Sequence, residues 1–380
     1  MGKASVESTN IVKMKVNDMV DLIVPLVVGA KRGKDLPGLN LTGAPGIGKS
    51  DGIREIGKRV AEATGKKVIV TDLRLLNLTP VDLIGIPAKD EQITTIIDEN
   101  GKEKEIKELV ARWLKPSVFA MSHSKDTINI LFLDEITAAP PSVQAAAYQL
   151  VLDRKVGEHK LPENCFVMCA GNRVTDKSVA YKMPKALANR MVHMEIVADV
   201  DDWKKWAISS GIDHRIIGYI NYQNTALFNF DPSSDDLAYA TPRSWAMVDK
   251  FLKVFADLEK AMPLICGSIG VGAATSFKGY VKVYANLPNV EDIFNGKAVK
   301  ISKSPDINFA LCSAIVNFIP KATNAQLENM LKFTMSDDFS PEYATLIIKD
   351  IGGAFPEILK KFTKLPAWIE WTKKFRGLVM

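Results

Sequence analysis

A glycine-rich segment that ends in a lysine and a serine has the composition of a phosphate-binding loop. It fits the pattern G-x-x-x-x-G-K-[ST] and consists of Gly43, Ala44, Pro45, Gly46, Ile47, Gly48, Lys49 and Ser50. Glycines let successive backbone N–H groups turn toward a β-phosphate, and the lysine ammonium adds a positive charge toward the β- and γ-phosphates. The serine hydroxyl is a ligand for Mg²⁺, and the positive end of the following helix points at the phosphates. The segment therefore predicts a binding site for ATP and Mg²⁺.

Two adjacent carboxylates, Asp134 and Glu135, follow a continuous apolar run further along the chain. A strand beside the phosphate loop would bring Asp134 close to Mg²⁺, and Glu135 would then orient and polarise the attacking water. Taken alone, the pair also fits the solvated end of a strand or the charges that a helix N-terminus favours. Because the chain carries the phosphate loop as well, we expect Asp134 to hold the metal together with Ser50.

Apolar and β-branched runs alternate with amphipathic helices around these two motifs. The pattern predicts strands at residues 39–42, 68–73, 128–133, 166–170 and 192–197, and helices at 50–63 and 140–152. Continuous apolar strands separated by helices favour a parallel sheet that is covered on both faces. Polar residues follow the strands, at the edge where open α/β sheets bind ligands. Between residues 74 and 127 the pattern loosens, and the charged run at 98–108 should be exposed.

The pairing of GAPGIGKS with ILFLDE resembles the AAA+ ATPases, and the downstream chain is similar to their MoxR branch. That branch belongs to a superclade with a hairpin inserted before sensor 1. The resemblance covers residues 35–290. Residues 82–85, with the variable stretch after them, resemble the helix-2 insert of this superclade, and residues 154–158 resemble its pre-sensor hairpin. Residues 165–172 resemble the sensor 1 strand, residues 184–190 the arginine-finger segment, and residues 241–244 the start of the sensor 2 helix.

This resemblance implies roles for three polar residues beyond the loop and the acidic pair. Asn172 would help to position water against the γ-phosphate, Arg190 would reach the γ-phosphate bound by a neighbouring copy, and Arg243 would sense that phosphate from a lid. Arg190 also precedes a predicted strand, so it should lie at a domain edge, as a finger donated to a neighbour must. Arg173, next to Asn172, is a competing candidate for an intersubunit contact.

Arg243 has a second argument from its position. It falls in the first turn of a predicted helix, with Thr241 as N-cap and Pro242 at the first helical position. A cation at this end opposes the helix dipole, which is easier to understand if the side chain faces an anion such as the γ-phosphate.

The predicted fold is a P-loop NTPase α/β sandwich with an AAA+ core, followed by an α-helical lid and a helical C-terminal extension. Strand-like runs disappear after residue 199, which marks a boundary between domains. We expect an N-terminal helical lead-in at residues 1–36 and the α/β nucleotide-binding domain at residues 37–198. The lid should follow at residues 199–295 and the extension at residues 296–380.

Composition excludes several classes of protein. With 47% hydrophobic and 24% charged residues, the chain of 380 residues is not disordered. Its four cysteines are too few for a disulfide-stapled scaffold. The polar start, MGKASVESTN, predicts no secretory signal, and no apolar run reaches the roughly 18 residues that a membrane span needs. We therefore expect a cytoplasmic protein.

The expected function is ATP hydrolysis by a homo-oligomer, which the resemblance makes a hexameric ring, coupled to remodelling of a protein client. The same resemblance suggests a von Willebrand factor A domain protein as partner. The alternative is a motor acting on DNA or RNA, for which a net charge of +5 is weak support. A third possibility, a scaffold that binds ATP but barely hydrolyses it, is disfavoured by the intact Asp134, Glu135 and Arg190.

An aromatic and basic stretch near the C-terminus leaves a second route to nucleic acid open. Residues 360–376 mix lysines with Trp368, Trp371 and Phe375. Such a segment can stack on single-stranded nucleic acid or bind a helix groove in a partner. Packing against its own domain is the favoured interpretation, because Trp371 and Phe375 are four residues apart on a predicted helix.

Overall fold

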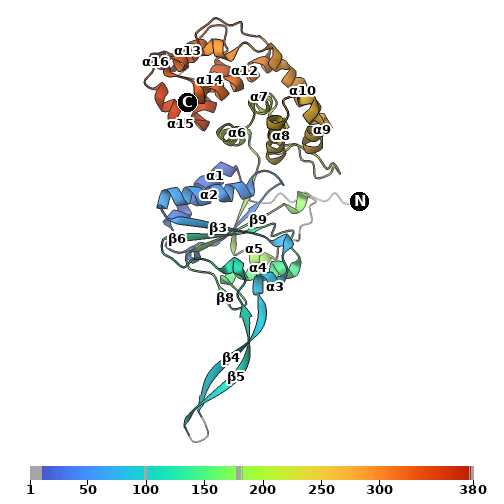
Figure 1. Ribbon diagram of the computed structural model, residues 1–380, viewed down its shortest axis with the longest axis vertical. Coiled ribbons are helices and arrows are strands. Elements are labelled where there is room, and N and C mark those ends of the chain that lie inside the picture. Colours follow the sequence, from blue (N-terminus) through green and yellow to red (C-terminus); the bar gives the residue numbers. More distant parts are fainter. Residues whose placement is uncertain (1–10, 98–100, 177–180, 182, 376, 378–380) are drawn as a thin grey trace. The chain divides into compact units, whose positions relative to one another are not determined.

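A computed structural model describes residues 11–97, 101–176, 181, 183–375 and 377 (Figure 1). The chain divides into two compact units, residues 1–197 and 198–380, and each is described by itself. In the part of the chain that the structure describes, no helix combines the length and the apolar character needed to cross a bilayer.

The first unit is built on a six-stranded sheet in which every pairing is parallel. Its strands, in spatial order, are β1 (Lys13–Met14), β10 (Met191–Ile196), β2 (Gly38–Thr42), β9 (Cys165–Gly171), β6 (Thr127–Asp134) and β3 (Lys67–Arg74). The predicted fold class is confirmed, and the predicted strands all occur, with ends that differ by one residue at most. The edge strand β1 was not predicted, because two residues are too short for a periodic pattern.

Helices cover both faces of this sheet (Figure 1). Helices α1 (Val16–Gly29) and α2 (Lys49–Thr64) lie on one face, and α3 (Pro80–Ile84), α4 (Pro141–Asp153) and α5 (Lys185–Ala188) lie on the other. Helix α2 buries Ile53, Ile56 and Val60, which are spaced for one helical face. Helix α4 packs its buried side chains against those of β6 and β9. Strand β6 is buried along its whole length, which explains its continuous apolar sequence.

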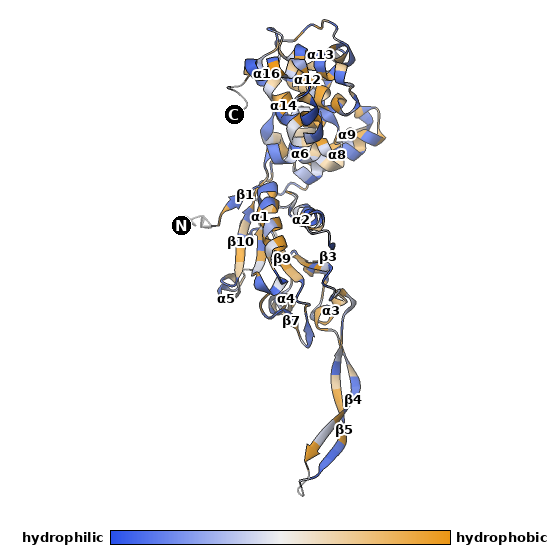
Figure 2. Ribbon diagram, turned by 90° about the vertical axis from the view of Figure 1, so that its left-hand side faces the viewer, coloured by the Kyte–Doolittle hydropathy of each residue, from blue (hydrophilic) through white to orange (hydrophobic). Residues whose placement is uncertain are grey.

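A long antiparallel ribbon is inserted between β3 and β6. Strands β4 (Ile86–Ile97) and β5 (Glu103–Leu114) pair from Ile86 opposite Leu114 to Ile97 opposite Glu103, and the ribbon projects away from the sheet (Figures 1 and 2). Part of the charged run predicted to be exposed, residues 98–100, lies outside the described residues. The part in β5, residues 103–108, is exposed apart from Ile106. A second, very short hairpin consists of β7 (Lys155–Val156) and β8 (His159–Lys160).

The second unit is helical. Its helices are α6 (Val200–Ser209), α7 (His214–Tyr222), α8 (Pro242–Val254), α9 (Leu258–Ile269), α10 (Val271–Val283), α11 (Val290–Phe294), α12 (Pro305–Phe318), α13 (Asn324–Thr334), α14 (Pro341–Ala354), α15 (Pro356–Phe362) and α16 (Pro366–Phe375). One hydrophobic cluster extends from Trp203 to Phe375. The sequence predicts a lid at residues 199–295 and an extension at residues 296–380. Helices from both ranges bury their apolar faces in this one cluster, so the two ranges share a hydrophobic core.

The aromatic residues of α16 belong to this core. Trp371 and Phe375 are buried, and the indole Nε1 of Trp371 donates a hydrogen bond to Thr334 Oγ1 at 3.1 Å. Trp368 stacks on Trp371 with 5.3 Å between ring centroids. The aromatic face of this helix is thus packed against its own domain and is not a stacking platform for nucleic acid.

A buried ion pair also joins the two ranges of the second unit. Lys204 on α6 donates to Asp350 on α14 at 3.0 Å, and both side chains are almost fully buried. Burial raises the pKa of Asp350, whereas the charge of Lys204 and its hydrogen bond lower it. Buried pairs of this kind contribute little as a whole, but loss of one partner leaves an uncompensated charge.

Lys204→Ala should therefore lower the free energy of unfolding by about 3–5 kcal/mol at neutral pH, measured by urea denaturation of the full chain. The folded-state pKa of Asp350 lies above its unfolded value, so the folded form gains stability as the pH falls through that pKa and loses it as the pH rises. Removing Lys204 raises this pKa further, so the deficit of the variant should shrink on acidification. Lys205→Ala, an exposed neighbour, should stay within about 0.5 kcal/mol of wild type. Equal losses in both variants would contradict the assignment.

Candidate nucleotide-binding site

The glycine-rich loop connects the carboxyl end of β2 to the first turn of α2. Gly46 and Gly48 have φ angles of 75° and 98°, a region that favours glycine and that turns the loop's N–H groups inward. Gly43 faces a tighter restriction, because a Cβ there would lie 2.5 Å from the carbonyl oxygen of Ile196. Ala44 and Ile47, two further residues of the loop, are buried. The first turn of α2 therefore begins beside the loop, where a helix N-terminus favours an anion.

Lys49 lies across this loop. Its Nζ donates to the carbonyl oxygens of Gly43 and Ala44, at 2.7 and 2.9 Å, and to Oδ1 of Asn172 at 3.2 Å. The lysine thereby joins the loop to the end of β9. Its ammonium group is held at the mouth of the loop, where a bound phosphate would meet it.

Ser50 and Asp134 form the second contact across the site. The hydroxyl of Ser50 donates to Oδ2 of Asp134 at 3.0 Å, while Oδ1 of Asp134 accepts from the backbone N–H of Glu135 at 2.9 Å. A hydroxyl and a nearly buried carboxylate, with oxygens this close, match the hard oxygen ligands that Mg²⁺ takes from proteins. These two residues therefore fit the metal that the loop sequence implies.

Glu135 is held in a conformation that few residues adopt. Its φ angle is 58°, in the left-handed region that costs about 1 kcal/mol or more for a residue with a side chain. The turn is fixed by the backbone N–H of Ile136, which donates to the carbonyl oxygen of Ala170 at 2.9 Å. The carboxylate of Glu135 is half-buried, and the described residues offer it no hydrogen-bond or ion-pair partner. Strain of this kind is typical of functional positions, and here it presents a carboxylate with free acceptor oxygens.

Asn172 reaches the site because β9 lies between β2 and β6. Thr42 pairs with Gly171, so the residue after each strand lies at the same edge of the sheet. The hydroxyl of Thr137 donates to the backbone oxygen of Asn172 at 3.3 Å and fixes this corner. A Cβ at Gly171 would lie 2.6 Å from that hydroxyl. Thr137 is a positioning residue that the sequence analysis missed, although its place three residues after Asp134 could have suggested it.

Arg190 lies at the opposite edge of the same sheet. It precedes Met191, which pairs with Gly38 at the amino end of β2, whereas the loop follows the carboxyl end of that strand. The five residues of β2 span about 17 Å. Arg190 therefore does not reach the loop of its own chain. Its side chain is exposed, and no hydrogen bond or ion pair to a described residue holds it.

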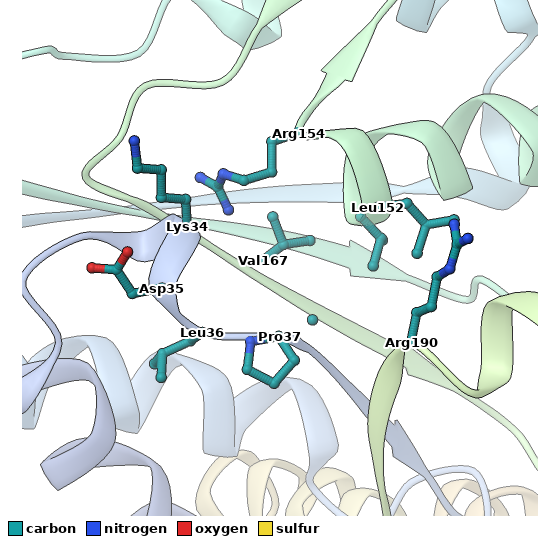
Figure 3. Close-up of a pocket in the computed structure, with 10 residues that line it drawn as sticks. Lys34, Asp35, Leu36, Pro37, Leu152, Arg154, Val167 and Arg190 are labelled. Carbon is teal, nitrogen blue, oxygen red and sulfur yellow. The ribbon is translucent and has the colours of Figure 1, made fainter.

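A pocket of about 350 Å³ adjoins Arg190 at this edge (Figure 3). Lys34 and Arg154 line it as well, but both are engaged, since Lys34 pairs with Glu163 and Arg154 donates to the carbonyl oxygens of Pro162 and Cys165. Arg190 is the lining cation without a described partner, so it can turn toward an anion from outside the chain.

Arg173, the competing candidate, is committed inside its own unit. Its guanidinium contacts Asp176 at 2.8 Å and Glu195 at 3.1 Å, and both carboxylates are buried. Burial lowers the pKa of Arg173, but the hydrogen bonds and charges of these two residues outweigh it and raise that pKa. Transfer of this arginine to a neighbouring copy would leave two buried carboxylates without their cation.

Arg243 belongs to the second unit, in the first turn of α8. Thr241 caps the helix by accepting from the N–H of Ser244 at 3.1 Å, and Pro242 is the first helical residue, as the sequence predicts. The side chain of Arg243 is exposed and has no hydrogen-bond or ion-pair partner among the described residues.

Comparisons with known proteins give remote structural likenesses. No family model and no curated protein matches the chain. NtrX from Brucella abortus, solved in complex with ADP, is 12% identical over 96% of this chain and 68% of that chain, with a TM-score of 0.36. A mutant of RuvB from Thermotoga maritima is 12% identical over 85% and 90%, with a TM-score of 0.34. The replication initiator DnaA bound to AMPPCP and single-stranded DNA is 14% identical over 96% and 91%, with a TM-score of 0.36. These TM-scores lie below 0.5, so the likenesses assign no function to the chain.

Proposed function

We propose that the chain is a magnesium-dependent ATPase that converts ATP and water to ADP and phosphate. The observation that carries this proposal is the convergence of Lys49, Asn172 and the Ser50–Asp134 pair at the carboxyl ends of three adjacent strands. These residues are far apart in the sequence, and each supplies a group that phosphoryl transfer requires.

Each residue has a separate part in the proposed reaction. The loop N–H groups and Lys49 bind the phosphates, and Ser50 and Asp134 would hold Mg²⁺, which would supply positive charge for the phosphate oxygens. Glu135 orients the water that attacks the γ-phosphorus, as the bond to the bridging oxygen breaks and ADP leaves. Asn172 positions that water. A scaffold with little turnover would have no need for the strained backbone of Glu135, so hydrolysis is favoured over binding alone.

Arg190 extends the proposal to an oligomer. An exposed arginine without a described partner, at the edge opposite its own loop, suits a contact with the γ-phosphate of a neighbouring copy. Such a residue contributes about 10³–10⁵ to the rate of phosphoryl transfer. We therefore propose a homo-oligomeric ring, hexameric by resemblance, in which adjacent copies complete each site. The exposed Arg243 is included as a second cation for the γ-phosphate.

The proposed work of this ring is remodelling of a protein client, with a von Willebrand factor A domain protein as a partner suggested by resemblance. A motor on DNA or RNA is the second candidate. The buried aromatic face of α16 removes one of the surfaces that could have bound nucleic acid. Stimulation of ATP hydrolysis by an unfolded protein supports the first candidate, and stimulation by oligonucleotides that weakens with salt supports the second.

Specific ATPase activity should therefore fall on dilution, in step with dissociation of the oligomer. The test measures phosphate release per chain over a wide range of protein concentration, with mass photometry of the same samples. Sites completed by a neighbour are lost when the neighbour dissociates, so the rate per chain should drop by about 10³-fold or more in the monomer. Single chains that hydrolyse ATP at full speed would refute the shared site.

A further inference from the structure

The antiparallel ribbon formed by β4 and β5 is unpartnered along its length. The two strands pair with each other, and the described residues contain no third strand beside either of them. Each outer edge therefore presents a row of backbone N–H and C=O groups that could pair with another chain. At 12 residues per strand, the ribbon is about 40 Å long, far more than a turn between β3 and β6 requires.

One face of the ribbon carries a stripe of exposed apolar side chains, here defined as Ile93, Ile97 and Leu109. Ile93 and Ile97 are four residues apart on β4 and therefore lie on one face. Leu109 is paired with Glu91 and Ile93 with Lys107, which makes Leu109 a diagonal neighbour of Ile93 on that face. Their exposed fractions are 57%, 75% and 74%. Two-stranded ribbons are marginally stable by themselves, so large apolar residues on an exposed one indicate a surface that a partner covers.

The charges of the ribbon disfavour nucleic acid as that partner. The described strands contain four cations, Lys89, Lys104, Lys107 and Arg112, against five carboxylates. Two of these cations are neutralised within the ribbon. Arg112 pairs with Asp90 at 3.0 Å, and Lys107 lies 4.0 Å from Glu91. A nearly neutral surface gains little from phosphate contacts, whereas a protein strand needs only open edges and apolar pockets.

We propose that the ribbon binds an extended, apolar polypeptide segment, which adds as a third strand on an open edge, beside the apolar side chains of the stripe. Backbone hydrogen bonds along the edge provide affinity, and the stripe selects apolar side chains at alternate positions. This inference specifies the client of the proposed ATPase, but binding at the ribbon does not itself require hydrolysis.

The test uses the full chain and a fluorescein-labelled ten-residue peptide of alternating valine and threonine, with fluorescence anisotropy as the readout. The triple variant Ile93→Thr, Ile97→Thr and Leu109→Thr places β-branched residues at all three strand positions and removes the apolar stripe. Its affinity for the peptide should fall about tenfold or more, a loss of about 1.4 kcal/mol. The matched control, Leu237→Ser with Val254→Thr and Val271→Thr, removes three exposed apolar side chains elsewhere and should bind as wild type does. The same peptide with every backbone nitrogen methylated should bind weakly, because neither of its edges can donate hydrogen bonds to the ribbon.

Several results would overturn the ribbon proposal. These are no binding by the wild type, equal losses in the triple and control variants, or unchanged binding of the N-methylated peptide. Displacement of the peptide by oligo(dT) would identify nucleic acid as the partner of the ribbon. Dissociation of the oligomer in the triple variant, measured by mass photometry, would identify a second copy of the chain as that partner. The ATPase assay is independent: normal hydrolysis without peptide binding refutes only this inference, whereas peptide binding without hydrolysis refutes only the proposed function.

Discussion

The Lys49→Ala variant should bind MgATP about a hundredfold more weakly than the wild-type chain, or worse. The ammonium group is the charged donor held between the loop carbonyls and Asn172, at the position where phosphate oxygens would replace those acceptors. Removing one partner of a charge-assisted contact of this kind costs about 2–5 kcal/mol. Isothermal titration with a slowly hydrolysed ATP analogue measures the loss directly.

Lys58→Ala is the matched control for this prediction. Lys58 lies on the same helix, with an exposed side chain, and its replacement removes the same charge from the chain. Its affinity for the nucleotide should equal that of the wild type. Undiminished affinity in Lys49→Ala would refute the assignment of the loop.

Mixing two inactive variants should restore ATP hydrolysis. Glu135→Gln should bind ATP but lose about 10²–10⁴ in rate, because an amide does not polarise the water as a carboxylate does. Arg190→Ala should also bind ATP and lose about 10³–10⁵ in rate. In a mixed oligomer, some interfaces combine the intact Glu135 of one copy with the intact Arg190 of the next. A steady-state phosphate-release assay on co-assembled samples should detect these interfaces.

The partner used in the mixture provides the control. Glu135→Gln mixed with Lys49→Ala leaves no chain with an intact loop and an intact carboxylate, so activity should stay at the level of the separate variants. Lys185→Ala, an exposed cation in the segment that leads to Arg190, should remain active alone. If assemblies shown to be mixed recover nothing with Arg190→Ala, donation between copies is wrong.

The sheet and the loop were predictable because their signals are local. Strand β6 is buried on both faces, so its apolar run is continuous, and the glycines of the loop stand at positions where backbone geometry requires them. The acidic pair follows that strand directly in the sequence. The contact between Lys49 and Asn172 depends on the order of strands, which places β9 between β2 and β6. Local patterns contain no information on that order.

Two features of the fold were not predictable in this way. The ribbon has apolar and charged residues on both faces, so β4 and β5 lack the alternation that identifies half-buried strands. The helices of the second unit were recognisable one at a time, but periodicity does not say which helices share a core. The pair between Lys204 and Asp350 joins residues on either side of the expected boundary at 295, a contact that periodicity alone does not reveal.

The placement of the loop and Arg190 at opposite edges of one sheet restricts the symmetry of any assembly that uses both. A two-fold dimer must bury the same patch on both copies. Because the loop and Arg190 lie at opposite edges of the sheet, one such patch cannot contain both. Copies must therefore associate head to tail, with a donor edge and an acceptor edge at every junction. Such a chain of contacts either closes on itself or grows into a helical filament, and the rotation between successive copies decides which.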